Sequence, residues 1–299
     1  MRNHFQYWMN TMIYRPLFIV VLIAAGMAGS CVSQMASTPG TPSVSSPFSP
    51  FSPPFKTPST PDASGEFFPD PKVAALARTL EHNDWTGAAK ALSAGADVNA
   101  IGQDDMTLPM WAMYVKNKKA FEWLFKHGAN PNFDPGHNRC ALFWAARAED
   151  TDWLRILLAH KANPNLTHTN SIGSTETPLM ALAMERRLTN LKMLIAAGAD
   201  VNYQQPSGGH PTAASMTAQF GWFEGTYVLL EAGADFRPKG AVDLTYLVVR
   251  RTLSKDPFRE KVIQLLRARG ADIDGAMKMV SDEEAQDRKD NPWRYQENK

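Results

Sequence analysis

Short apolar stripes with helical spacing recur between residues 73 and 269, and a small tripeptide follows each stripe. One stripe holds Phe121, Leu124 and Phe125, which would share one face of a helix. The tripeptide positions lie 33, 33, 37, 35 and 37 residues apart. Such a period predicts a solenoid of stacked helix pairs, because one unit cannot bury its apolar face alone. The tripeptides are Gly95-Ala96-Asp97, Gly128-Ala129-Asn130, Lys161-Ala162-Asn163, Gly198-Ala199-Asp200, Gly233-Ala234-Asp235 and Gly270-Ala271-Asp272.

The glycine of each tripeptide is predicted to end the second helix of a pair in the left-handed conformation, which glycine adopts without strain. Lys161 replaces glycine at one of these positions, so we expect that turn to be less stable. Four units share a second pattern, which starts 21 residues before the capping position. It begins at Thr107, Cys140, Thr177 and Thr212. Threonine there is a good helix N-cap, so the pattern predicts the start of a first helix.

The third copy of this pattern, Thr177-Pro178-Leu179-Met180-Ala181-Leu182-Ala183, resembles the Thr-Pro-Leu-His-x-Ala-Ala element of ankyrin repeats. The resemblance covers residues 69–275. It implies an all-α fold, an ankyrin-repeat solenoid of about six helix pairs with projecting hairpin loops, here called fingers, beside a concave face made by the first helices. Residues 73–94 and 243–269 depart from the motif and are expected to form the N-terminal and C-terminal caps.

Residues 1–30 are predicted to be a secretion signal. Arg2 and Arg15 precede an apolar run at residues 17–25, which is shorter than the about 20 residues of a membrane span. The small residues before Cys31 resemble the lipobox of bacterial lipoproteins, which implies lipidation of Cys31, although Ala28 stands where that family usually has Leu. Conventional cleavage after Ser30 and an uncleaved membrane anchor remain alternatives.

Residues 31–68 are rich in Ser, Thr and Pro and are predicted to form a disordered tether. Three phenylalanines in it, Phe48, Phe51 and Phe55, are spaced three or four residues apart. The segment with these phenylalanines is interpreted either as a plain linker or as a motif that docks on a partner. Residues 276–299 form a charged C-terminal tail. This tail either adds a helix that packs on the last repeat or stays mobile.

Composition disfavours several function classes. The net charge is +1, so bulk charge does not favour nucleic acid as a partner. Cys31 and Cys140 are the two cysteines, and a lipidated Cys31 leaves Cys140 as a small buried thiol without a disulfide. His127 and His160 occupy equivalent repeat positions, too far apart to share a metal. The sequence also lacks the common catalytic and phosphate-binding motifs, so we expect no metal, no cofactor and no enzyme.

Length variation among the repeats falls in the fingers and indicates where binding occurs. The distance from a capping position to the next helix start is 12, 12, 16 and 14 residues, so residues 166–176 and 203–211 form enlarged fingers. Insertions on one face of a solenoid often mark the binding face, although loops also tolerate them. The ankyrin resemblance implies that residues after the Ala-Ala element point into the concave groove, unless the next repeat half buries them. The predicted protein-binding residues are Tyr114, Val115, Arg147, Met184, Glu185, Gln219 and Phe220, together with the finger residues His137, Arg139, Glu176 and His210.

These patterns predict a monomeric binding module in the bacterial envelope. Lipid on Cys31 would tether it to the periplasmic side of the outer membrane, and the concave face and fingers would bind another protein. Bacterial ankyrin lipoproteins of this build resemble immunity proteins that neutralise secreted antibacterial toxins. The alternative is an envelope scaffold or stress-accessory protein with several partners.

Overall fold

The computed structural model describes residues 63–136, 140–169, 175–205, 211–238, 243–250 and 255–294. The chain divides into two units, Met1–Ser52 and Pro53–Lys299, and all described residues belong to the second. The predicted signal segment, the lipidation of Cys31 and residues 31–62 of the predicted tether lie outside the described residues.

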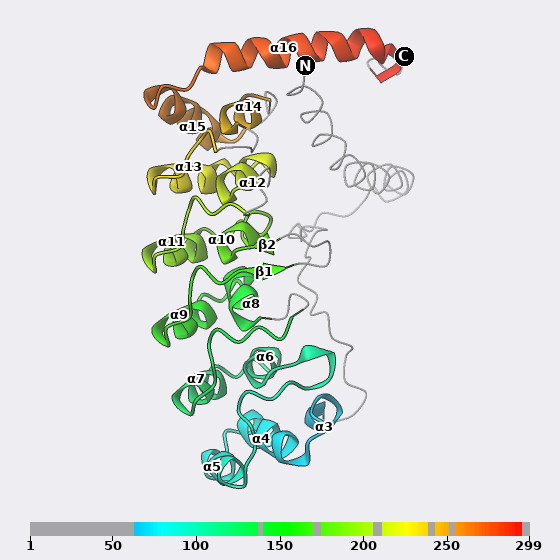
Figure 1. Cartoon of the computed structure of the whole chain (residues 1–299), viewed down its shortest axis with the longest axis vertical. Helices are drawn as coiled ribbons and strands as arrows, with labels where there is room; N and C mark the ends of the chain where they lie inside the picture. Colours follow the sequence, from blue (N-terminus) through cyan, green and yellow to red (C-terminus); the bar gives the residue numbers. More distant parts are fainter. Residues whose placement is uncertain are drawn as a thin grey trace, which may run out of the picture. The chain divides into compact units, whose positions relative to one another are not determined.

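The described residues form two parallel rows of helices, stacked pair upon pair (Figure 1). Each pair contributes one helix to each row, and the predicted all-α solenoid of helix pairs is confirmed. The first helices are α4 (Pro71–Glu81), α6 (Leu108–Tyr114), α8 (Ala141–Arg147), α10 (Pro178–Ala181), α12 (Ala213–Gln219) and α14 (Leu244–Val249). The second helices are α5 (Trp85–Ser93), α7 (Lys118–Lys126), α9 (Asp152–Ala159), α11 (Leu188–Ala196), α13 (Phe223–Glu231) and α15 (Pro257–Ala268).

Threonine side chains start three of the first helices, as the repeated motif predicts. The Thr107 Oγ1 accepts a hydrogen bond from the Met110 N–H at 3.3 Å, and Thr177 makes the same contact to Met180. Thr212 forms a capping box with Ser215, in which each side chain accepts from the backbone N–H of the other. Each such cap stabilises its helix by about 1 kcal/mol. Cys140 occupies the equivalent position without a side-chain cap bond.

The predicted left-handed helix ends are confirmed at both the glycine and the lysine positions. Gly128 has a φ of 96°, and Lys161 at the equivalent place has a φ of 64°. The next residue closes each helix in the same way: Ala129 N–H donates to the Leu124 carbonyl, and Ala162 N–H donates to the Leu157 carbonyl, both at 3.0 Å. Lys161 therefore adopts the geometry of a glycine at the steric cost of a β-carbon.

Asparagine side chains join neighbouring repeats, a feature that the motif comparison did not anticipate. The Asn99 Nδ2 donates to the Gly128 carbonyl at 3.2 Å, and the Asn99 Oδ1 accepts from the Asn130 N–H at 2.8 Å. We call this pair of bonds the asparagine clip. The clip recurs at Asn132, Asn165 and Asn202. Arg237 stands at the next equivalent position, and there the Arg269 guanidinium donates to the Leu230 and Ala234 carbonyls instead.

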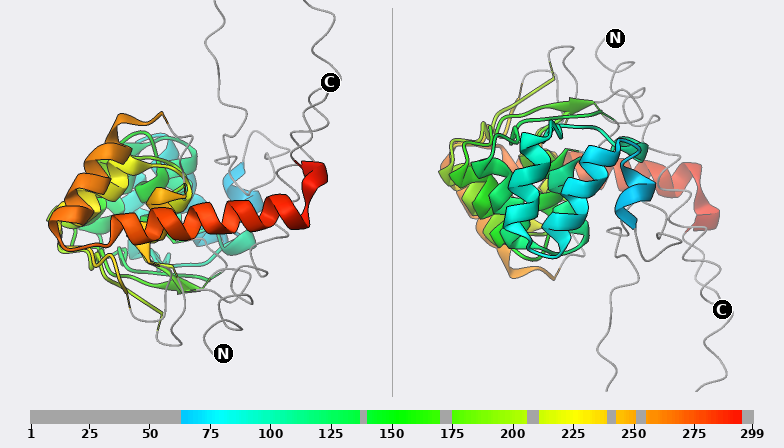
Figure 2. Two further views of the ribbon diagram at one scale, coloured as in Figure 1. Left: turned by 90° about the horizontal axis from the view of Figure 1, so that it is seen from above. Right: turned by 90° about the horizontal axis from the view of Figure 1, so that it is seen from below.

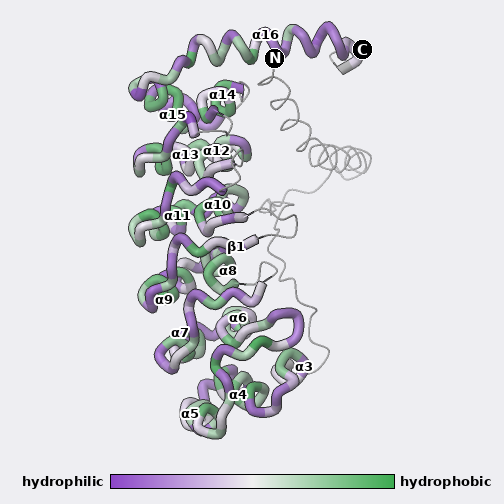
Figure 3. The backbone as a smooth tube through the Cα atoms, in the orientation of Figure 1, coloured by the Kyte–Doolittle hydropathy of each residue, from purple (hydrophilic) through white to green (hydrophobic). Residues whose placement is uncertain are grey.

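The core lies between the two rows of helices. Hydrophobic residues concentrate in the helices and hydrophilic residues in the connecting loops (Figure 3). Asn190 of α11 is 1% exposed, and its Nδ2 donates to the Ala146 and Ala148 carbonyls at 2.7 and 2.9 Å. This buried amide satisfies the carbonyl end of α8 and fixes α11 against it.

Additional elements lie at both ends of the stack and in the fingers. The connecting loops project to one side of the helices (Figure 2). Helix α16 packs on α14, where Ile273 and Val280 are buried and the Tyr246 hydroxyl donates to Glu283 at 2.5 Å. The C-terminal tail thus contains an extra helix. None of the described helices is long and apolar enough to cross a bilayer. The elements are α3 (Ala63–Phe67), η2 (Gln103–Asp105), β1 (His168–Thr169), β2 (Thr175–Glu176), α16 (Ile273–Asp290) and η3 (Pro292–Arg294).

Candidate protein-binding face

The predicted binding residues lie at the C-terminal ends of four consecutive first helices. Tyr114, Arg147 and Gln219 are the last residues of α6, α8 and α12, while Met184 lies in the turn after α10. Helix stacking therefore arranges them in a row along the solenoid. We call this surface the inner face and define it by Tyr114, Val115, Arg147, Met184, Glu185, Gln219 and Phe220.

Two large apolar side chains of the inner face are exposed on neighbouring helix pairs. The exposed fraction is 61% for Met184 and 39% for Phe220. The Arg186 guanidinium donates to the Phe220 carbonyl at 3.0 Å and to the Gly221 carbonyl at 3.3 Å. Arg186 thereby fixes the turn that carries Met184 to the helix end that carries Phe220. The repeat pattern alone does not indicate this role of Arg186, because its acceptor lies 34 residues away along the chain.

Arg147 and Glu176, two of the predicted binding residues, face each other. Their Nη2 and Oε2 atoms lie 4.0 Å apart, with side chains 24% and 20% exposed. The Arg147 Nε also donates to the Ala181 carbonyl at 3.4 Å, and Arg187 donates to the Arg147 carbonyl at 3.1 Å. The guanidinium is held between two repeats, so Arg147 has a positioning role in this surface in addition to its charge.

Tyr114 is half-buried, because α3, the first described helix, packs against it. Its ring stacks on Trp111 with a centroid distance of 5.6 Å, and Phe67 of α3 approaches at 6.1 Å. Phe67 and Phe68 are 5% and 2% exposed. Helix α3 thus fills one end of the inner face, and it does so within the segment predicted to be tether.

A glycine in the first finger permits this contact. Helix α3 packs against α4 and against η2 of that finger. A β-carbon on Gly102 would lie 2.3 Å from the Phe67 carbonyl oxygen and 2.8 Å from the Phe68 ring. No side chain fits at that distance, so Gly102 is required by the close approach of two backbones and not by its φ.

The first enlarged finger is a short antiparallel hairpin, in which His168 pairs with Glu176 and Thr169 with Thr175. The His168 side chain is 1% exposed, and its Nδ1 lies 3.3 Å from the Asp134 Oδ2 of the preceding finger. The His168 and Phe143 rings pack in a T-shaped arrangement, with their centroids 5.5 Å apart. His168 therefore anchors the finger to the helix stack. His137, Arg139 and His210, and with them most of the second enlarged finger, lie outside the described residues.

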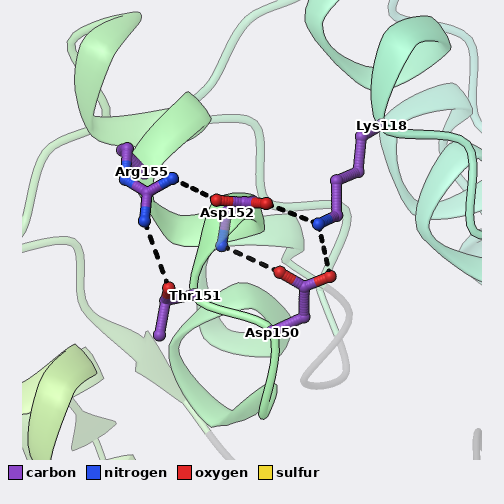
Figure 4. Close-up of polar contacts among 5 residues, drawn as sticks. All are labelled: Lys118, Asp150, Thr151, Asp152 and Arg155. Carbon is purple, nitrogen blue, oxygen red and sulfur yellow. Dashed lines mark hydrogen bonds and ion pairs between the residues drawn. The ribbon is translucent and has the colours of Figure 1, made fainter.

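A charged network ties α7 to α9 (Figure 4). The Lys118 Nζ lies 2.6 Å from Asp150 and 2.5 Å from Asp152, and Arg155 binds Asp152 from the other side. Hydrogen bonds to Asp150 and Asp152 raise the pKa of Lys118, while those from Lys118 and Arg155 lower the pKa of Asp152. The network links the N-terminal ends of the two helices.

Cys140 is buried in the helix stack. Burial raises the pKa of the Cys140 thiol to about 11, so the thiol remains protonated and is a poor nucleophile at neutral pH. This agrees with its interpretation as a small buried residue. Within the described ranges, no three His, Cys, Asp or Glu side chains are grouped so that they could hold a metal ion.

Comparison with known proteins supports the repeat assignment. Residues 78–168 and 110–205 match the sequence model of ankyrin repeats in three copies. The chicken nuclear factor NF-kappa-B p105 subunit is 34% identical over 125 residues, which cover 42% of this chain and 12% of that protein. Protein PhlB of Serratia liquefaciens is 31% identical over 137 residues, which cover 46% of this chain and 59% of that protein. The match thus spans less than two thirds of either relative.

Among solved structures, an ankyrin repeat domain from Acinetobacter baumannii superposes with a TM-score of 0.53 at 22% sequence identity. The superposition covers 66% of this chain and 97% of that domain. At this sequence identity it shows a shared fold and nothing further. Motif spacing, helix pairing and both kinds of comparison agree. Residues 78–205 are ankyrin repeats, and the described part of the chain is an ankyrin-repeat solenoid.

Proposed function

We propose that this chain is an envelope protein that neutralises a secreted antibacterial toxin by binding it through the inner face. Ankyrin repeats indicate a protein–protein interaction module. The finer assignment is supported by the signal-like residues 1–30, by Cys31 after small residues and by the bacterial relative PhlB. In this proposal a lipid on Cys31 holds a monomer at the periplasmic side of the outer membrane, and binding rather than catalysis is the mechanism.

The exposed pair Met184 and Phe220 carries the proposal. Single exposed apolar residues are common on soluble proteins and need no explanation. Here two of them occupy neighbouring repeats of the same face, and Arg186 holds their backbones in a fixed relationship. Methionine and aromatic residues are enriched in the cores of protein interfaces, where they contribute much of the binding energy. The inner face therefore has the composition of a preformed protein-binding surface.

The ion pair between Arg147 and Glu176 adds selectivity for the partner's charge. Both side chains are less than a quarter exposed, and Arg147 also donates to the Ala181 carbonyl at the end of α10. A partner that brings a carboxylate to Arg147, or a cation to Glu176, would compete for one half of this pair. Partly buried charges discriminate between partners more than they add affinity. This arrangement favours a single cognate partner over many weak ones.

The test is capture of the partner by the full chain in living cells with mild crosslinking, followed by identification of what is bound. One dominant, stoichiometric protein supports an immunity role, and its delivery to cells should kill only those that lack this chain. A broad set of weakly enriched envelope proteins would instead support the scaffold alternative.

The double variant Met184→Asp, Phe220→Asp should reduce capture of that partner at least about 100-fold, as expected for loss of two hot-spot residues. The matched control is Met277→Asp, Met279→Asp, which makes the same kind of change at exposed positions of α16. Tyr114 is unsuitable as a probe, because its ring is part of the packing with Trp111 and Phe67. Equal capture by the inner-face variant and the control would refute the assignment of the binding surface.

A further inference from the structure

We propose that Arg186 binds a carboxylate of the protein partner, and that the partner presents this Asp or Glu side chain next to the apolar residues that cover Met184 and Phe220. The inference names the chemistry of the partner, and it rests on the proposed function of the inner face.

Arg186 links the two exposed apolar residues of the inner face. It follows Met184 by two residues, and its Nη2 donates to the Phe220 carbonyl at 3.0 Å and to the Gly221 carbonyl at 3.3 Å. The residue is exposed, and its Nε and Nη1 N–H groups donate to no described residue. The two bonds from Nη2 hold the guanidinium in place, so its remaining donors are available to an acceptor on the partner.

Two nearby arginines show what Arg186 lacks. Arg147 and Arg187 also donate to backbone carbonyls of a neighbouring repeat, but each has a carboxylate of this chain beside it. Arg147 lies 4.0 Å from Glu176, and Arg187 lies 3.1 Å from Glu149. Among the described residues, no carboxylate forms an ion pair with Arg186. Its charge is therefore left for the partner to neutralise.

Binding of a protein to Met184 and Phe220 would also remove water from Arg186, because the guanidinium lies at hydrogen-bond distance from the Phe220 backbone. A cation that loses its water without gaining an opposite charge weakens a complex strongly. A carboxylate offsets this loss, since hydrogen bonds between guanidinium and carboxylate are among the strongest polar contacts in proteins. The apolar residues and the unpaired arginine together favour a partner with an acidic side chain close to apolar ones.

Arg186 also has a structural role, because it donates to carbonyls at the C-terminal end of α12, where a positive charge is favourable. A purely structural arginine would leave the charge of the bound partner unimportant. The readout that separates the two roles is therefore the charge preference of the inner face, measured beside the stability of the fold.

Lys116 offers a matched control position. Lys116 and Arg186 both lie twelve residues before the capping position of their helix pair, and both are exposed. Their φ values are 57° and 54°. Reversal of either charge changes the net charge of the chain equally. Lys116 belongs to the second helix pair and not to the pairs that carry Met184 and Phe220, so its reversal leaves the apolar residues untouched.

Selection from a phage-displayed library of random peptides tests the charge preference without the natural partner. The purified full chain, its Arg186→Glu variant and its Lys116→Glu variant are each used as bait. Peptides that also bind the uncharged variant Met184→Ser, Phe220→Ser are discarded. We expect the wild-type chain and the Lys116→Glu variant to enrich peptides that carry Asp or Glu beside an apolar residue. The Arg186→Glu variant should instead enrich peptides with Lys or Arg at that place.

Calorimetric titration of one enriched peptide then tests the contact itself. The synthetic peptide is amidated at its C-terminus, so that its side chains carry its only carboxylates. Replacement of its acidic residue by the matching amide should weaken binding at least about tenfold, and Arg186→Gln, which keeps an N–H donor for the Phe220 carbonyl, should do the same. The two changes together should weaken binding no more than either alone, because both remove one contact. Circular dichroism and urea unfolding of each variant check that the fold is retained.

Selection of the same acidic peptides by the wild-type chain and the Arg186→Glu variant would overturn the proposal. Selected peptides without a carboxylate, the absence of any peptide that depends on Met184 and Phe220, or additive losses in the double change would do so as well. None of these assays contains the natural partner. Partner capture by the inner face can therefore succeed while this inference fails, and a captured protein that meets Arg186 without a carboxylate would refute the inference alone.

Discussion

Asn165 is hydrogen-bonded to the repeat that follows it through Asp200, whose backbone N–H donates to the Asn165 Oδ1 at 2.6 Å. The Nδ2 of the same side chain donates to the Gly198 carbonyl at 3.0 Å. One amide group thus satisfies a donor and an acceptor of the neighbouring turn. Because repeats contact only their neighbours, such links determine how cooperatively the array unfolds.

Asn165→Ala should lower the free energy of unfolding by about 1–3 kcal/mol, since it removes both bonds and leaves two backbone groups without these partners. The change is measured by urea unfolding followed by circular dichroism. Arg237→Ala, at the equivalent position of the next repeat, is the control and should cost less than about 0.5 kcal/mol, because its side chain does not form the clip. Similar costs at both positions would contradict the importance of the clip.

Lys161→Gly should stabilise the protein by about 1 kcal/mol. Lys161 has a φ of 64°, and a left-handed conformation at a residue with a β-carbon costs about 1–2 kcal/mol that glycine does not incur, partly offset by the greater entropy of glycine in the unfolded chain. Thermal unfolding measures the effect. Lys161→Ala removes the charge and keeps the β-carbon, so it should give no such gain. A gain in the alanine variant equal to that in the glycine variant would point to charge and not to backbone strain.

The Lys118 network should contribute stability over a defined pH window. Its pairing lowers the pKa of Asp152 below the ordinary 3.8, so this contribution is present above that value and is lost as pH falls through the lower folded pKa. The pKa of Lys118 is raised above 10.5, so its contribution is present below 10.5 and is lost as pH rises through the folded value.

Lys118→Met should therefore lower the urea midpoint near neutral pH and lose its effect in strong acid. The neighbouring exposed change Lys119→Met controls for the loss of one positive charge. High salt should shrink the difference, because these side chains are roughly 40% exposed and are screened. A difference that persists unchanged at low pH and high salt would contradict the ion pairs as the source of this stability.

Gly102→Ala should release α3 from the inner face, because the new β-carbon would overlap the Phe67 carbonyl. We expect hydrogen exchange of residues 63–68 to accelerate and stability to fall by about 1–3 kcal/mol. Gly65→Ala is the control: a β-carbon at Gly65 meets nothing within 4 Å, and alanine favours the helix by about 1 kcal/mol. Unchanged exchange in the Gly102 variant would show that the finger can move aside.

Cys31→Ser should abolish labelling of the chain by a radioactive or clickable fatty acid in bacterial cells and move the chain from the membrane to the soluble fraction. Cys140→Ser should leave labelling unchanged, because Cys140 is buried. Persistent membrane association of the Cys31 variant without label would favour an uncleaved N-terminal anchor.

Features that depend on neighbouring residues could be predicted from the sequence, and long-range contacts could not. Thr177 and Gly198 cap helices through bonds within a few residues, so their roles follow from local chemistry. The repeat period then places Met184 and Phe220 within the same two-residue stretch of neighbouring repeats. By contrast, Arg186 reaches an acceptor 34 residues away, and α3 packs on a finger whose fit depends on Gly102.

The asparagine clip leaves a visible pattern in the sequence, an asparagine two residues after the Asp or Asn of the first four tripeptides. Its role becomes clear only when two stacked repeats are seen together. Asn190 is a different case. A polar side chain on a predicted apolar stripe gives no sign that it will bond the carbonyl end of a helix some 42 to 45 residues earlier.

The series of asparagine clips ends at Asn202, and the sixth helix pair is joined to the fifth by the Arg269 guanidinium and by the packing of α13 on α15 instead. Repeat arrays fray from their ends. Met184 and Phe220 both lie on the N-terminal side of Arg237. Heat, mechanical load or a protease could therefore remove the C-terminal end of the solenoid and leave the inner face intact.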